Sequence, residues 1–123
     1  MPEVPVLEQS MLRELQETTG DDPDFLRDLV ETYLADVPVQ LEGIDGAVAA
    51  NDADALVRPA HTLKSSSLTL GALRLGDISR TLEMTGRSGA PDATARENAD
   101  AAHSEWDVVR EALKAWLAGQ ARQ

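Results

Sequence analysis

The chain has 123 residues, of which 42% are hydrophobic and 3% aromatic, and it carries a net charge of −11. This length fits a single domain over residues 1–123, and the negative charge argues against nucleic acid or a membrane surface as a partner. Because the chain has no cysteine, it has neither a disulfide framework nor a thiolate zinc site.

The start of the chain carries no sign of a signal peptide. The opening residues MPEVPVLEQS lack the basic start and apolar run of a signal peptide. No segment reaches the roughly 20 apolar residues that span a bilayer. We therefore expect a soluble protein of the cytoplasm, and a monomer. The opening methionine and the polar C-terminal GQARQ favour a free-standing protein.

Hydrophobic spacing predicts two helices in the first part of the chain. Apolar residues recur at helical spacing over residues 7–15, and Thr19-Gly20 ends this short helix. A long helix then opens with an aspartate cap and Pro23 in its first turn, and its apolar residues recur every three or four positions over 25–48. Pro38 lies inside this stretch, so we expect a kink or an interruption just before it.

The third predicted helix runs from about Ala53 to Leu70 and contains the first of two histidines. Its core-facing stripe includes Leu56 and Leu63. His61 lies about 160° from Leu63 on a helical wheel, so its ring should point outward. Pro59 removes one hydrogen bond from a helix interior. The helix therefore either bends at Pro59 or begins there.

Two further helices complete the predicted fold. Residues 72–89 form the fourth, and a loop with Gly and Pro separates it from the last helix, which begins at an Asp92 cap and ends near Leu117. Trp106 and Trp116 lie on the apolar side of that helix and should belong to the core. The pattern predicts an all-α protein: an antiparallel four-helix bundle with a short additional N-terminal helix.

Charge is distributed unevenly along this helical chain. Residues 57–88 hold five basic and two acidic side chains, a local net charge of +3, whereas the rest is strongly acidic. The segment around His61 is therefore the electropositive part of an acidic molecule and should attract an anionic group or an acidic partner. Alternatively, the uneven charge only keeps exposed helix faces soluble.

Several kinds of active site lack their parts in this sequence. There is no phosphate-binding Gly-Lys loop, no dinucleotide-binding glycine motif and no His-Glu-x-x-His pair. His61 and His103 fall on different helices without a convincing carboxylate at ligand spacing, which argues against a metal site. The serines at 65–67 have no oxyanion-hole turn, so a serine hydrolase has no support. We expect no cofactor.

The remaining candidate is an exposed imidazole with Lys64 three positions later and Ser65 four positions later. Those positions share the histidine's patch of helix surface. A neutral imidazole is a nucleophile near pH 7, and phosphoryl transfer depends on positioning and charge neutralisation more than on covalent help. Lys64 can supply the charge, and Ser65 leaves room for a bulky donor. The same residues also fit an ordinary surface histidine beside a lysine.

The stretch AHTLKSSSLTLGALRLGDISRTLE closely resembles the motif of histidine-containing phosphotransfer (HPt) domains, His-x-Leu-Lys-Gly-Ser followed by Gly-Ala and Leu-Glu. The flanking helices also match, so the likeness covers nearly the whole chain. It implies that His61 accepts phosphate and that Lys64 stabilises the phosphohistidine. It also suggests that Glu83 accepts a hydrogen bond from Nδ1 and leaves Nε2 as the nucleophile.

The pattern leaves two points open at this stage. A carboxylate beside the ring also favours the imidazolium, which cannot attack, and a simple solvent-exposed Glu83 fits the spacing equally well. Ser65 stands where the motif has glycine. Because serine obstructs an approaching backbone slightly, we expect slower transfer or a narrower choice of partner.

By this resemblance, the chain is a phosphorelay intermediate of two-component signalling and a carrier rather than an enzyme. His61 would accept a phosphoryl group from a receiver-domain aspartate or a hybrid kinase and pass it to another receiver aspartate. The implied partners are response-regulator receiver domains, which bring Mg²⁺, and a histidine kinase. They would dock over Arg58, Ser65, Leu68 and Arg80. The alternative is a non-phosphorylatable helical adaptor that binds the same domains.

Overall fold

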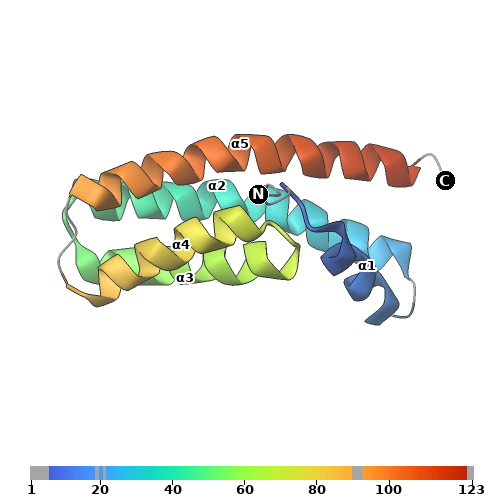
Figure 1. The fold of residues 1–123 in the computed structure, drawn as a ribbon, viewed down its shortest axis with the longest axis horizontal. Coiled ribbons are helices and arrows are strands. Elements are labelled where there is room, and N and C mark those ends of the chain that lie inside the picture. Colours follow the sequence, from blue (N-terminus) through green and yellow to red (C-terminus); the bar gives the residue numbers. More distant parts are fainter. Residues whose placement is uncertain (1–5, 19, 21, 90–92, 122–123) are drawn as a thin grey trace, which may run out of the picture.

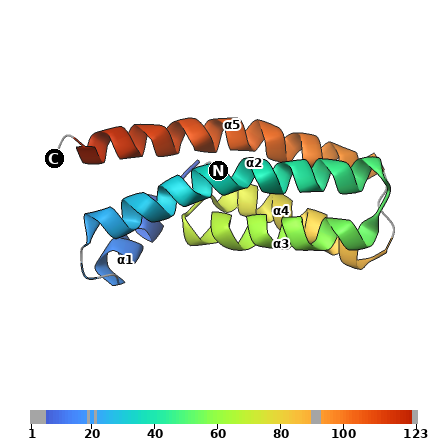
Figure 2. The same ribbon diagram turned by 180° about the vertical axis from the view of Figure 1, so that it is seen from behind.

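The computed structural model describes residues 6–18, 20, 22–89 and 93–121, which form five helices (Figure 1). In chain order, the helices are α1 (Gln9–Thr18), α2 (Pro23–Ala49), α3 (Ala53–Thr69), α4 (Leu73–Arg87) and α5 (Ala93–Ala121). The four longer helices form an antiparallel bundle, and α1 lies beside the N-terminal part of α2 (Figures 1 and 2). The predicted all-α fold class is confirmed.

Local signals set the starts of α2 and α3, the two helices that enclose the groove described below. The Asp22 carboxylate accepts hydrogen bonds from two N–H groups in the first turn of α2, and Asp52 accepts one from the Ala55 N–H at 3.1 Å. Gly71, with φ of +88°, forms the turn from α3 to α4. Its carbonyl accepts a hydrogen bond from the Glu8 N–H at 2.8 Å, which binds the chain before α1 to this turn.

Two prolines lie inside helices and do not end them. Helix α2 continues through Pro38 without the interruption that we considered, and Figure 2 shows it bending along its length. Helix α3 begins at Ala53, so the alternative in which it starts at Pro59 is wrong. Pro59 packs against Gly43 of α2, where an added Cβ would lie 3.3 Å from the proline Cβ. The missing side chain lets α2 and α3 approach closely there.

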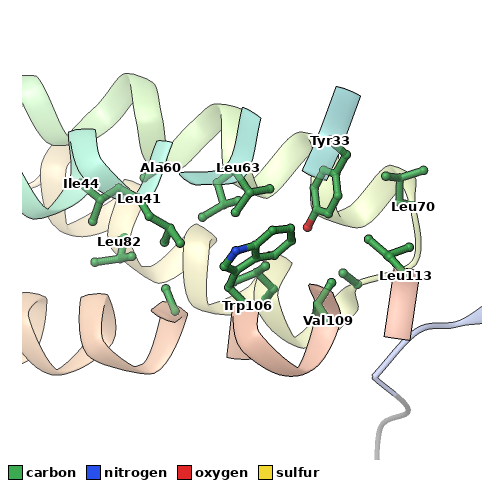
Figure 3. Close-up of a cluster of buried hydrophobic side chains, with 14 of the residues drawn as sticks. Tyr33, Leu41, Ile44, Ala60, Leu63, Leu70, Leu82, Trp106, Val109 and Leu113 are labelled. Carbon is green, nitrogen blue, oxygen red and sulfur yellow. The ribbon is translucent and has the colours of Figure 1, made fainter. Parts of the chain in front are cut away.

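The core lies between the four bundle helices (Figure 3). Trp106 of α5 packs edge-on against Tyr33 of α2, with ring centroids 5.5 Å apart and an interplanar angle of 77°. Trp116 packs partly buried against the same cluster, so both tryptophans contribute to the core as predicted. The Tyr33 hydroxyl also makes a 2.7 Å hydrogen bond with Ser67 of α3. Because burial raises the pKa of Tyr33, this buried link between α2 and α3 stays uncharged.

The predicted helix ends differ from the observed ones by a few residues. Helix α5 continues to Ala121, beyond the predicted end at Leu117. The predicted Asp92 cap and the stop at Thr19 lie outside the described residues. Within the part of the chain that the structure describes, no helix combines the length and the apolar character needed to cross a membrane.

Candidate functional site

His61 lies on the outer side of α3, with 54% of its side chain exposed. Leu56, Ala60 and Leu63 of the same helix are fully buried. Because these residues face the core, the helix turns the ring of His61 toward solvent. The predicted outward orientation of the ring therefore agrees with the structure.

A single carboxylate, that of Glu83 on α4, contacts His61 and two cations. Its oxygens lie 3.2 and 3.1 Å from Nδ1 of His61, and Oε1 lies 2.8 Å from Nζ of Lys64. Arg87, one turn later on α4, donates to Oε2 from Nε at 2.9 Å and from Nη2 at 2.7 Å. Only 7% of the Glu83 side chain is exposed, so the alternative of a solvent-exposed glutamate is wrong.

Two glycines of α4 on either side of Glu83 bring this helix close to α3. A Cβ on Gly76 would collide with Cδ2 of Leu68, and one on Gly86 would come within 3.0 Å of the Ala53 carbonyl oxygen. At Gly86 a larger residue would press on the α3 backbone and separate the helices, whereas at Gly76 the Leu68 side chain would have to move. The close approach of α3 and α4 therefore depends on Gly86 in particular, and it helps to place the Glu83 carboxylate beside His61 and Lys64.

The surrounding donors keep Glu83 ionised. The hydrogen bond from Lys64 is the main cause that lowers the pKa of Glu83 from 4.5 to about 2; burial opposes it, and hydrogen bonds from Arg87 and His61 add to the lowering. An ionised carboxylate only accepts hydrogen bonds, so the nitrogen that faces it, Nδ1 of His61, carries a proton. In the neutral ring, the lone pair is then on Nε2.

A groove of about 440 Å³ between α2 and α3 adjoins His61. Its α3 wall includes four hydroxyl side chains as well as His61, and its α2 wall is mixed apolar and polar, with Leu29, Thr32, Asp36 and Gln40. The hydroxyls of Ser66 and Thr69 donate to carbonyls of the preceding turn of α3, at 3.0 and 2.9 Å. The helix thus satisfies these wall hydroxyls itself, and a partner in the groove would not have to displace those bonds.

The four residues predicted to form the docking surface for a partner are not all in this groove. Ser65 lines it. Leu68 is only partly exposed, because its side chain packs over Gly76 of α4, on the other side of α3 from the groove. Arg58 is exposed on α3, and Arg80 is exposed on α4, 3.6 Å from Asp77.

Sequence reasoning missed two parts of this arrangement. Arg87 was counted only as part of the basic segment, although its place four residues after Glu83 is the spacing at which helical side chains meet. The sequence carries no pattern that indicates the α2 wall of the groove, because this wall forms only when α2 packs against α3. Among the described residues, no group of three or more His, Asp or Glu side chains is arranged to hold a metal ion.

Comparison with known proteins assigns the chain to a family. The model of the Hpt domain matches residues 28–119, and the chain belongs to the Hpt domain family. Among solved structures, it resembles histidine-containing phosphotransfer protein B (HptB) from Pseudomonas aeruginosa PAO1, with 28% sequence identity, a TM-score of 0.84 and coverage of 98% of this chain and 99% of that one.

A second solved structure supports the fold alone. It is the HPT domain of an Hpt sensor hybrid histidine kinase from Shewanella, with 16% identity, a TM-score of 0.77 and coverage of 95% of this chain and 97% of that one. No curated protein sequence matches the chain. The family and the likeness to HptB support a phosphotransfer role in two-component signalling, and they confirm the resemblance read from the His61 motif.

Proposed function

We propose that this protein is a phosphorelay intermediate: it accepts a phosphoryl group on Nε2 of His61 from the aspartate of a receiver domain and passes it to the aspartate of another receiver. The observation that carries this proposal is the Glu83 contact with Nδ1, which leaves Nε2 of a half-exposed ring for reaction. Membership of the Hpt family supports the same chemistry.

The transfer makes one bond and breaks one bond. As phosphorus bonds to Nε2 of His61, its bond to the donor aspartate oxygen breaks, and that electron pair remains on the aspartate carboxylate. The ring gains positive charge, and the adjacent Glu83 carboxylate stabilises it. Lys64 provides a cation for the incoming phosphoryl group. Transfer to the next receiver reverses these changes.

The receiver would approach His61 along the groove between α2 and α3. Ser65 and His61 both line this groove, and the mixed lining suits a contact that must form and release quickly. Arg58 of α3 and Arg80 of α4, which are exposed outside the groove, would add positive charge facing an acidic receiver site. In this proposal the receiver brings the Mg²⁺, and this chain contributes the ring, Lys64 and Glu83.

The experiment is phosphate transfer from a panel of phosphorylated receiver domains. Wild-type protein should become labelled, His61→Gln should take no phosphate and keep its fold, and His103→Gln should be labelled like wild type. Acceptance of phosphate by His61→Gln would refute the site. Incubation with ATP alone should give no label, because the proposal assigns the chain no kinase activity.

The second candidate is an adaptor that binds receivers or kinases without exchanging phosphate. The observation that favours it is Ser65, which stands at the groove where the family motif has glycine. A receiver that binds the wild-type protein and leaves His61 unlabelled would support the adaptor. Phosphate on His61 after mixing would support the relay.

A further inference from the structure

In the proposed reaction, Lys64 neutralises two anions: the Glu83 carboxylate and the phosphoryl group. In the structure its ammonium group lies 2.8 Å from Oε1 of Glu83. Glu83 contacts the Nδ1 edge of the imidazole, whereas the phosphoryl group would arrive on Nε2, at another edge of the same ring. We take Nζ to give up its contact with Oε1 as it turns its N–H donors toward the phosphoryl oxygens at that other edge.

Departure of Lys64 would cost free energy if Glu83 had no other cation. The carboxylate is only 7% exposed, and a buried charge without a partner is strongly unfavourable. Without a second fixed cation, Glu83 would hold Lys64 until the ring itself became positive, and the arriving phosphoryl group would lack its partner. Alternatively, Glu83 would take up a proton and cease to act as a charged acceptor for Nδ1.

Arg87 is placed to remove this conflict. Its guanidinium binds Oε2 through both Nε and Nη2, whereas Lys64 binds Oε1. The two cations thus use different oxygens, and the paired contact of Arg87 is fixed by the planar shape of its group. Lys64 can leave Oε1 while Oε2 keeps its bonds.

Resting on the phosphotransfer function proposed above, we infer that Arg87 is a positioning residue. It keeps Glu83 paired and ionised against Nδ1 of His61 while Lys64 moves from Oε1 to the phosphoryl group. Arg87 itself touches neither the ring nor the phosphoryl group in this account, and it acts only through the charge of Glu83.

The test measures the rate of phosphate transfer from one phosphorylated receiver domain to a set of variants. Arg87→Gln should slow transfer about tenfold, the size expected when a charge-assisted hydrogen bond is lost. Arg87→Lys, which restores one charged donor, should recover much of the rate. Arg27→Gln is the matched control, because Arg27 pairs with Asp24 near the start of α2. This variant should accept phosphate at the wild-type rate.

A double variant separates action through Glu83 from direct contact with phosphate or receiver. Glu83→Gln keeps an oxygen for Nδ1 but needs no cation, so adding Arg87→Gln to it should change the rate less than about twofold. An effect of Arg87→Gln that is equally large in both backgrounds would overturn the inference. So would an Arg87→Gln variant that transfers at the wild-type rate.

Two measurements keep the outcomes distinct. Thermal unfolding of each variant shows whether a slow rate reflects loss of the fold. If Arg87→Gln alone is unstable, the effect of Arg87 is measured in the Glu83→Gln background, where residue 83 carries no charge for Arg87 to compensate. If the wild-type protein takes no phosphate on His61, the proposed function and this inference both fail. If it takes phosphate and Arg87→Gln matches it, only the inference fails.

Discussion

The molecule contains two histidine–carboxylate pairs, and they differ in ways that matter chemically. His61 is 54% exposed and pairs with Glu83, whereas His103 of α5 is 47% exposed and lies 2.7 Å from Asp45 of α2. The Glu83 side chain is 7% exposed and binds two cations, whereas that of Asp45 is 39% exposed and has no cationic partner besides His103 among the described residues.

The two pairs also use opposite ring nitrogens. Glu83 faces Nδ1 of His61 and leaves Nε2, the nitrogen farther from the backbone. Asp45 faces Nε2 of His103, so the nitrogen left over is Nδ1, which lies next to the backbone. Under the proposed function, an exposed imidazole beside a carboxylate is therefore not enough: we expect a phosphate acceptor only where the carboxylate binds Nδ1 and is itself neutralised by other groups.

The largest expected difference between the two pairs is their reaction with phosphoramidate, a small phosphoryl donor. Ammonia leaves as a phosphorus bond to the ring forms, and we expect the product on Nε2 of His61 alone. NMR of the labelled protein identifies the nitrogen. His103→Gln should be labelled like wild type and His61→Gln should not. Label on His103, or on Nδ1 of His61, would contradict the comparison.

The next effect concerns the cation beside His61. The chain has two lysines, and the second, Lys114, is exposed on α5 away from both pairs. Lys64→Ala should slow transfer by about tenfold or more and shorten the lifetime of the phosphohistidine, because the phosphoryl charge loses its partner. Lys114→Ala should change neither. Equal kinetics for the two variants would remove Lys64 from the mechanism.

Much of the fold could be predicted because its signals are local. The Asp22 and Asp52 caps and the apolar spacing of the helices depend on residues within a few positions of one another. The passage of α3 through Pro59 could not be predicted in this way. Pro59 packs against Gly43 of a neighbouring helix, and a tertiary contact of this kind leaves no local signal in the sequence.

The residues of the site also differ in whether a local pattern or tertiary packing reveals them. Helical spacing alone indicated that His61 and Lys64 share a surface. Glu83 lies on another helix, so only the family motif suggested it, and its burial required the packing of α4 on α3. Its pairing with Arg87, four residues later on the same helix, had a local signal that was not used. Leu68 was expected to form part of the docking surface, but the absence of a side chain at Gly76 lets it pack against α4.

A smaller effect is the response of stability to acid. The pKa of Glu83 lies at about 2 in the folded protein against its ordinary value of 4.5, so its stabilising contribution is complete above pH 4.5 and is lost as the pH falls toward 2. Urea unfolding should show Glu83→Gln less stable than wild type by roughly 1–3 kcal/mol at pH 7. This difference should shrink across that window.

Asp45→Asn is the matched variant for the other pair. Because the Asp45 carboxylate is well exposed, its removal should cost less than about 1 kcal/mol at pH 7. If the difference between Glu83→Gln and wild type stayed constant from pH 7 to pH 2.5, the ionised state assigned to Glu83 would be wrong.

The smallest effect distinguishes the helix surfaces that follow the two histidines. Ser65 lines the groove one turn after His61, whereas Ser104 is exposed on α5 next to His103. Ser65→Gly and Ser104→Gly should each lower stability by about 0.5 kcal/mol, because glycine weakens a helix interior. Only Ser65→Gly should speed transfer, because it removes a hydroxymethyl group from the path of the receiver backbone. We expect a twofold to threefold faster rate, which corresponds to an activation free energy lower by about 0.5 kcal/mol. Stopped-flow transfer rates and thermal unfolding measure the two effects, and unchanged or slower transfer by Ser65→Gly would show that the serine does not obstruct the partner.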